Sequence, residues 1–288
     1  MNRHNWIGVL LFGGLFVESF FLQGNAALYV NGPALLIVTC GTLGALFLCY
    51  PASDLYAAVR VALNLYRHPL PSSNEVVSTM MEMALQSRNH GLLALESMGE
   101  QSTISFLKRA LGLLVDRMRE DELVEILNAE MLHFRQRRAL IERTFRQAAL
   151  FAPAFGVAGS VVGLIDMLAG VDDPGVVLKT IPLALTSPLY GVLLANAVFF
   201  PIAEGIHSKT QKELLIQKLI TDGVLVIQRE TNPRRLAIKL ESFLTPSART
   251  LGSLSLGEIR ERLQQFQSEP ETEAPWAGGE TARPRPRP

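Results

Sequence analysis

The segment APAFGVAGSVVGLIDML, residues 152–168, is the part of the sequence that says most about the fold. It is apolar almost throughout, but it contains three glycines, a serine and an aspartate: Gly156, Gly159, Gly163, Ser160 and Asp166. A soluble core helix rarely tolerates so many glycines, because each costs about 1 kcal/mol relative to alanine. Membrane helices that pack closely against a neighbour use small residues readily. The stretch therefore predicts a membrane helix with a close packing partner.

Four apolar stretches are long enough to cross a bilayer core of about 30 Å, which takes about 20 residues. They are residues 6–22, 29–50, 148–169 and 180–203. The first, which ends before GNAA (24–27), also resembles a secretory signal peptide. Because Glu18 interrupts it and an uncharged span follows closely, we expect a retained membrane hairpin over 1–50.

Basic residues predict the orientation of these spans. The connections 23–28 and 170–178 contain no Lys or Arg, whereas the loop 51–147 and the tail 204–288 contain nearly all of them. The positive-inside rule then places the long loop and both termini in the cytoplasm of a multi-pass protein. The basic run RQRR (135–138) suits a solvated helix face near anionic membrane lipid.

The long loop has the spacing of amphipathic helices. Helices are expected over 74–88, with Asn74 as the cap and Gly91 as the stop, over 103–118, and over 120–150, which is long enough to run unbroken into the membrane. We expect an all-α integral membrane protein, divided into a hairpin (1–50), a cytoplasmic helical domain (51–147), a pore-lining hairpin (148–203), a cytoplasmic helical extension (204–267) and a disordered tail (268–288).

Composition and motifs exclude several function classes. The 288 residues include 27 basic and 27 acidic ones, so nothing indicates nucleic-acid binding. We find no Walker loop, nucleophile elbow or HExxH motif, and hence no catalytic residue. The five histidines lie outside the spans, and Cys40 and Cys49 have no metal-ligand spacing, so we expect no metal or cofactor and no enzyme activity.

Several motifs together resemble the A subunit of the flagellar motor stator, the MotA-like branch of the MotA/TolQ/ExbB proton-channel superfamily. They occur in the family's order over about 30–245: NGPALLIVTCGTLGA (31–45), RNHGLLALE (88–96), the stretch 152–168, DDP (172–174), YGVLLAN (190–196), FPIAEGI (200–206) and DGVLVIQRETNPRRLAIKLESFL (222–244).

The resemblance implies an ion-conducting subunit of the bacterial inner membrane. A homo-oligomeric ring of such chains would surround MotB-like B subunits, each with a single membrane helix, and would drive a FliG-like rotor protein. It implies that Gly156, Gly159 and Gly163, together with Tyr190, pack at the contact between subunits. The same glycines would also suit helix packing within one subunit, and the residues alone leave both alternatives open.

The resemblance also implies roles for two prolines and two charged residues. Pro153 and Pro201 match the prolines that couple ion flow to the cytoplasmic domain, and Arg88 and Glu96 match the pair that contacts the rotor. Exposed complementary charges suit fast, reversible contact.

The ion pathway implied by the resemblance includes four residues: Ser160, Thr186, Ser187 and Pro188. Sodium-driven relatives carry a second threonine where this chain has Pro188, and proline offers no hydroxyl ligand. Proline also frees the carbonyl of Ala184 from its helical bond, which suits a water chain. We therefore expect proton rather than sodium coupling. The family's proton-binding aspartate lies on the B subunit, so Asp166 is not that residue. A hydrated position at the outer end of its span and a role as an ion relay both remain open for Asp166, and Glu18 is assigned no role.

Two other functions remain as alternatives. ExbB/TolQ-like energy transducers form similar rings but have three spans, so the hairpin at 6–50 and NPRRL (232–236) favour the stator. A non-conducting membrane scaffold would not need the motifs of the third and fourth spans.

Overall fold

The computed structural model describes residues 14, 18, 29–65, 70–102 and 104–229, and every regular element in these ranges is a helix. The predicted span 6–22, apart from Gly14 and Glu18, and all of 230–288 lie outside the described residues. The labelled helices are α3 (Gly32–Cys49), α4 (Ala52–Leu65), α5 (Ser73–His90), α6 (Ala94–Gln101), α7 (Ser105–Val115), α8 (Glu120–Ala169), α9 (Pro174–Leu193), the π-helical turn η3 (Leu194–Phe199) and α10 (Phe200–Gln228).

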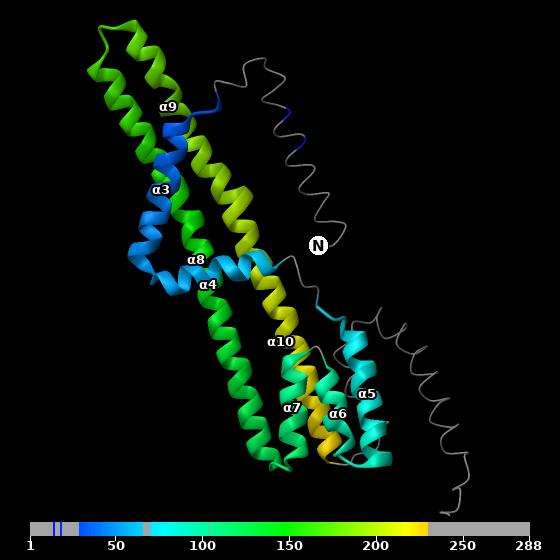
Figure 1. Cartoon of the computed structure of the whole chain (residues 1–288). Coiled ribbons are helices and arrows are strands. Elements are labelled where there is room, and N and C mark those ends of the chain that lie inside the picture. Colours follow the sequence, from blue (N-terminus) through cyan, green and yellow to red (C-terminus); the bar gives the residue numbers. More distant parts are fainter. Residues whose placement is uncertain (1–13, 15–17, 19–28, 66–69, 103, 230–288) are drawn as a thin grey trace, which may run out of the picture.

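Two long antiparallel rods form the frame of the molecule (Figure 1). Helix α8 has 50 residues and is about 75 Å long at 1.5 Å per residue. The second rod, α9, η3 and α10, returns along α8 over its whole length (Figure 1). The sequence correctly predicted that the helix starting at 120 runs on into the third apolar span.

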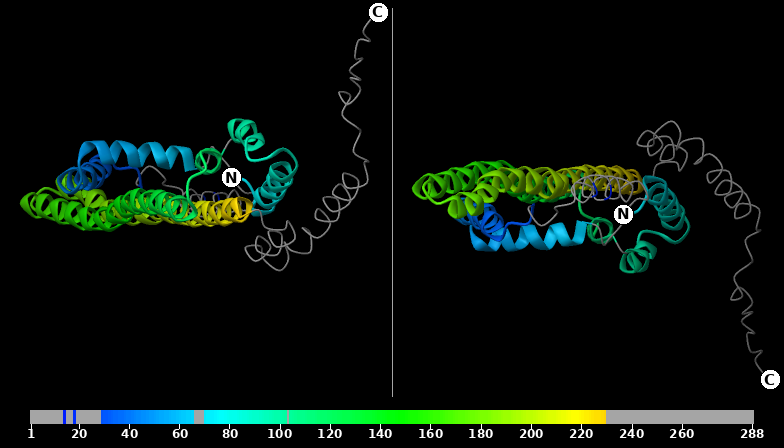
Figure 2. Two further views of the ribbon diagram at one scale, coloured as in Figure 1. Left: turned by 90° about the horizontal axis from the view of Figure 1, so that it is seen from below. Right: turned by 90° about the horizontal axis from the view of Figure 1, so that it is seen from above.

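The shorter helices divide the frame into two parts. Helix α3 lies along the α9 half and α4 crosses the rods (Figure 1). Helices α5–α7 gather beside the far ends of α8 and α10, and both views in Figure 2 show them at the yellow end of α10. Three helical segments are long and apolar enough to cross a membrane: Gly32–Cys49, Glu120–Ala169 and Pro174–Gln228. The described residues thus form an all-helical protein with three candidate membrane spans.

Local sequence explains where these helices begin. The Asp173 side chain accepts a hydrogen bond from Gly175 N at 2.8 Å, and Pro174 occupies the first helical position, so α9 begins before the apolar span at 180. Helix α5 is capped by Ser72, which accepts from Glu75 N at 3.2 Å. The expected cap at Asn74 was wrong, because Asn74 already lies inside the helix.

Helix ends in the loop domain follow turn chemistry. Gly91 ends α5 with φ +79°, a backbone conformation that glycine adopts without strain, as the sequence predicted. The expected helix 103–118 is shorter, because α7 ends at Val115 ahead of Arg117, whose φ is +53°. Helix α6 is too short for its period to be recognised in the sequence.

The α5–α7 helices share a hydrophobic core with the beginning of α8 and the end of α10. Its fully buried side chains include Met80, Leu107, Leu111 and Leu219. A Cβ on Gly223 would lie 2.5 Å from Met80 Cε, so the Met80 side chain of α5 packs against α10 where glycine leaves room for it. This core fixes α5–α7 to one end of the rods.

Candidate functional site

The apolar halves of α8 and α9 pack at backbone contact along a line of glycines. A Cβ on Gly156 would lie 2.9 Å from Ser187 O, and one on Gly163 would lie 2.8 Å from Ala184 N. One on Gly159 would lie 2.6 Å from Ser187 Oγ. Because real Cβ atoms do not come this close, only glycine permits this separation of the helices.

The contact is reciprocal at its far end, near the π-helical turn. A Cβ on Gly191 would lie 2.6 Å from Ala152 O and 2.9 Å from Pro153 Cα. Helix α3 completes the packing, since a Cβ on Gly41 would lie 2.3 Å from the ring of Phe155. The α8–α9 hairpin and α3 therefore form a tightly packed three-helix unit within one chain.

The packing shows which helix the three glycines of α8 contact. All three glycines of α8 are buried against α9 of the same chain, so the packing within one subunit is the contact that the structure shows. The expectation that they also line a contact between subunits stays a prediction. The exposed face of α8 carries larger apolar side chains instead: Val157, Val161, Val162, Leu164, Ile165 and Leu168.

Tyr190 likewise has its partners within the chain. Its hydroxyl accepts a hydrogen bond from Asn31 N at 2.8 Å and donates to the carbonyl of Tyr29. Asn31 also caps α3, because its side chain accepts from Ala34 N at 3.0 Å. Tyr190 thus ties α9 to the start of α3, and its predicted contact between subunits stays a prediction.

The structure brings two of the four predicted ion-pathway residues, Ser187 and Pro188, to the α8–α9 contact, and it buries a third, Thr186. Ser187 is fully buried, and its hydroxyl oxygen has no hydrogen-bond partner among the described residues. Pro188 Cα lies against Gly156, and Thr186 is buried with its hydroxyl donating to Pro182 O at 2.7 Å.

Ser160 is the fourth predicted pathway residue. It is half-buried on α8, next to Gly159 in the chain, and it has no contact with Ser187 among the contacts described here. Asp166 and Glu18 are exposed.

The orphaned hydroxyl of Ser187 is the unusual feature of this site. A buried polar group without a partner costs about 1–3 kcal/mol. Pro188 lacks an N–H, so the helix gives the carbonyl of Ala184 no bond from that position. A hydroxyl and a carbonyl with free hydrogen-bonding capacity therefore lie within one turn of α9.

The two predicted coupling prolines lie near a backbone irregularity of the second rod, since Pro153 of α8 packs against Gly191 just before it and Pro201 follows it in the chain. Pro153 sits inside α8, which continues through it, and Pro201 sits in the first turn of α10. Between α9 and α10 the chain forms the π-helical turn Leu194–Phe199. Such π-helical turns are rare in proteins, and those that do occur are frequently found at functional sites. The sequence predicted Pro201 but not this turn, although Pro201 has no N–H to bond the carbonyl four residues earlier, which lies within the turn.

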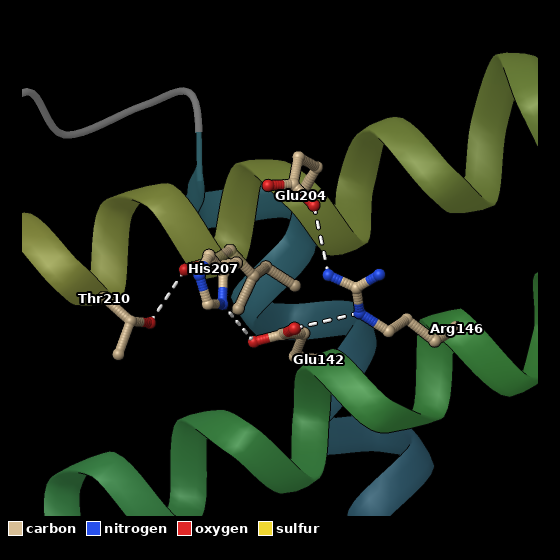
Figure 3. Close-up of polar contacts among 6 residues, drawn as sticks. Glu142, Arg146, Glu204, His207 and Thr210 are labelled. Carbon is tan, nitrogen blue, oxygen red and sulfur yellow. Dashed lines mark hydrogen bonds and ion pairs between the residues drawn. The ribbon is translucent and has the colours of Figure 1, made fainter.

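Beyond the prolines, charged side chains join α8 to α10 (Figure 3). Arg146 contacts Glu142 at 2.9 Å on its own helix and Glu204 at 3.0 Å on α10. The other Glu142 oxygen lies 3.0 Å from Nδ1 of His207. Sequence reasoning missed this cluster; only the i,i+4 spacing of Glu142 and Arg146 could have indicated part of it.

Burial affects the pKa of two residues in this region, Glu142 and Lys209, and at Glu142 the hydrogen-bond partners oppose its effect. Burial acts to raise the pKa of Glu142, but hydrogen bonds from His207 and Arg146 and their charges outweigh it and lower that pKa below its ordinary value. Burial lowers the pKa of Lys209, whose Nζ donates to Leu65 O of α4 at 3.2 Å.

The basic run 135–138 is not wholly solvated. Arg138 lies 3.3 Å from Glu213 of α10 and stacks 5.3 Å from the ring of Phe134. Arg135 and Arg137 are exposed, as expected.

The predicted rotor-contact residues flank the turn at Gly91. Arg88 lies in the last turn of α5 and Glu96 in the first turn of α6, and both side chains are exposed. Neither forms an ion pair with another described residue, so both charges are available to a partner. This turn lies at the α5–α7 end of the molecule (Figure 1).

Comparisons with known proteins agree with this architecture. Residues 98–218 match the family model described as the MotA/TolQ/ExbB proton channel family. The chain is 33% identical to the uncharacterised protein YtxD of Bacillus subtilis over 215 residues, which cover 75% of this chain and 79% of that protein. It is 31% identical to the chemotaxis protein PomA of Vibrio alginolyticus over 235 residues, which cover 82% of this chain and 92% of that protein.

A solved structure shares the fold. The flagellar MotAB stator complex from Bacillus subtilis matches with a TM-score of 0.77 at 26% identity, and the match covers 85% of this chain and 97% of that one. The packed hairpin, the charged helical continuation and these similarities lead to one assignment: the chain belongs to the MotA/TolQ/ExbB proton channel family, as a MotA-like member.

Proposed function

We propose that this chain is the ion-conducting A subunit of a bacterial flagellar motor stator, which works with a MotB-like B subunit to convert ion flow into torque. The observation that carries the proposal is the α8–α9 hairpin, packed at backbone contact and continued by both helices toward a separate helical domain. Its match to a flagellar stator complex over most of both chains supports the same function.

The proposed topology has four membrane helices in the bacterial inner membrane. Three correspond to candidate spans in the structure, and residues 6–22 supply the fourth. The absence of basic residues from the two short connections supports cytoplasmic termini and a cytoplasmic domain over 51–147.

Assembly into a ring around the single helix of the B subunit needs an apolar surface on the hairpin. The glycines of α8 are occupied within the chain, so we assign this contact to the opposite, exposed face of α8. Val157 and Val161 are 59% and 49% exposed, and Leu168 is 66% exposed. These exposed apolar side chains on a membrane span can face lipid or a partner helix.

Ion passage along α9 is supported by unused hydrogen-bonding groups. The Ser187 hydroxyl and the Ala184 carbonyl could orient water molecules, with Thr186 and Ser160 nearby. Sodium needs several oxygen ligands to replace its hydration shell, and Pro188 supplies none. We therefore propose that protons are the coupling ion.

Torque requires a link from this pathway to the rotor. Pro153, the π-helical turn and Pro201 give the two rods a place to bend, and the α8–α10 pair passes the movement to the α5–α7 domain. The exposed charges of Arg88 and Glu96 would then contact the FliG-like rotor protein.

Complementation tests this function directly. We would express the chain with its B subunit in cells of its source that lack both, and measure rotation of tethered cells and co-purification of the two chains. The proposal expects rotation and a multi-subunit complex. An ExbB/TolQ-like transducer or a non-conducting scaffold would form a complex without restoring rotation, and only the transducer would conduct ions.

A further inference from the structure

Four ionisable side chains form a connected cluster between α8 and α10 just beyond the coupling prolines (Figure 3). Glu142 and Arg146 are one turn apart on α8, and Glu204 and His207 are one turn apart on α10. Arg146 lies 2.9 Å from Glu142 and 3.0 Å from Glu204, and His207 Nδ1 lies 3.0 Å from Glu142. Each helix thus contributes two groups to one polar contact.

The charge of this cluster depends on the state of its histidine. Two carboxylates face one guanidinium, so the cluster carries one uncompensated negative charge while His207 is neutral. A proton on His207 brings the net charge to zero and turns its contact with Glu142 into an ion pair. Charge-assisted hydrogen bonds are roughly twice as strong as neutral ones.

The surroundings of His207 leave the carboxylate of Glu142 as its partner. Thr210, one turn further on α10, donates its hydroxyl to Ile206 O at 2.7 Å, within its own helix (Figure 3). Lys209 donates to Leu65 O and is directed toward α4. Helix α4 itself carries Asp54 and Arg60, and neither forms an ion pair with the cluster among the described contacts.

The remaining ion pairs between α8 and α10 in the described part of the chain join arginine to glutamate, as in Arg138–Glu213 and Arg229–Glu120. Such pairs keep both charges throughout the neutral range. Histidine is the side chain that ordinarily changes charge between pH 5 and 8. The side chain of His207 is 43% exposed, so solvent protons reach it.

We propose that His207, Glu142, Arg146 and Glu204 form a proton-binding site that clamps α8 to α10. Acidification loads the site and tightens the clamp, and alkalinisation releases it. The site lies where α10 leaves its proline-bearing first turn, because Glu204 follows Pro201 by one turn. It therefore sets how rigidly the two rods are joined immediately beyond the place where they can bend.

Placing this site on the cytoplasmic side rests on the proposed function and its topology. There the clamp would respond to the internal pH, on the side to which protons are delivered. The response is distinct from the ion pathway, because the cluster lies outside the apolar spans 148–169 and 180–203.

Hydrogen–deuterium exchange on the complete chain, purified with its B subunit, measures the clamp without requiring rotation. Amides of residues 200–215 are compared at pH 6 and pH 8 after correction for intrinsic rates. We expect local opening to be about two- to fivefold less frequent at pH 6, the range for a partly exposed ion pair. His207→Gln should abolish this difference, and His207→Lys should keep opening infrequent at both pH values.

His133→Gln is the matched control, because His133 is an exposed histidine of α8 whose ring faces Gln136 at 3.3 Å rather than a carboxylate. It should retain the wild-type pH dependence. Glu142→Gln removes the partner from the other helix, and it keeps the test decisive if a His207 substitution prevents folding.

An unchanged pH dependence in both His207→Gln and Glu142→Gln, or none in the wild type, would overturn the clamp. A pH-dependent clamp in a chain that restores no rotation would overturn the proposed motor function and leave the clamp in place.

Discussion

Gly159 of α8 and Ser187 of α9 lie so close that a methyl group on Gly159 would stand 2.6 Å from the Ser187 hydroxyl oxygen. The same hydroxyl is fully buried and has no hydrogen-bond partner among the described residues. The Gly159–Ser187 pair thus combines the closest contact of an α8 glycine with Ser187 and a buried hydroxyl that has no hydrogen-bond partner among the described residues. Packing and ion passage can be tested separately at these two positions.

Gly159→Leu should open the hairpin. Its side chain would collide with Ser187 and Ile37, and overpacking of this kind costs about 1–3 kcal/mol. We expect a lower melting temperature in detergent and loss of the complex with the B subunit. Gly44→Leu on α3 is the control, because a Cβ there meets nothing within 4 Å. Equal stability of the two variants would show that the glycine contact is not what holds the helices together.

Ser187→Ala should separate the structural from the conducting role. The substitution removes an unsatisfied buried hydroxyl, so the free energy of unfolding should stay the same or rise by about 1 kcal/mol. Proton flux through the reconstituted complex should nevertheless fall severalfold. Unchanged flux would remove Ser187 from the pathway.

Several features of the fold could be predicted from the sequence because they depend on long patterns. The run from 120 through 169 is long and periodic, and the apolar spans 29–50 and 180–203 match candidate membrane segments in the structure. Helix ends were less predictable, because they depend on single side chains such as Ser72 and Asp173.

The partners of individual side chains could not be predicted at all. A glycine strip is compatible with packing inside or between subunits, and the structure buries Gly159 within the chain. Likewise, contacts between residues 142 and 207 depend on the alignment of two rods, and no local pattern encodes it. The sequence therefore indicated a candidate site, but it did not indicate which residues of that site contact one another.

Removing sodium tests the coupling ion. Because Pro188 offers no hydroxyl, rotation or ion uptake by the reconstituted complex should persist when sodium is replaced by choline at a constant proton gradient. Motor speed and internal pH are the two measurements. Activity that collapses without sodium and returns in proportion to added sodium would contradict proton coupling.

Arg88→Glu should impair torque without affecting the fold. The side chain is exposed and forms no ion pair with the described residues, so the free energy of unfolding should change by less than about 0.5 kcal/mol. A charge reversal on the rotor should restore part of the speed in a tethered-cell assay. Lys108→Glu, at an exposed position of α7, is the control. Normal swimming of the double variant Arg88→Glu, Glu96→Lys with an unchanged rotor would exclude this contact.

Acid should loosen the joint between the rods through Glu142. Its pKa is lowered in the folded protein, since the hydrogen bonds and charges of His207 and Arg146 outweigh the effect of burial. The stabilisation is therefore fully present above the ordinary carboxyl value of 4.5 and is lost as the pH falls through the lower folded pKa. Melting temperatures between pH 3 and 6 should fall less steeply for Glu142→Gln than for the wild type.

Glu125→Gln supplies the matched control for acid sensitivity, because Glu125 is an exposed carboxylate of the same helix with no ion pair among the described residues. Its melting curve should follow the wild type throughout this range. If Glu142→Gln and Glu125→Gln respond alike, the Glu142 contacts contribute nothing to stability. The stabilisation by the Glu142 carboxylate is lost below pH 4.5, whereas a histidine ordinarily changes charge between pH 5 and 8, so this result and the exchange experiment on His207 probe different protonation steps of the same cluster.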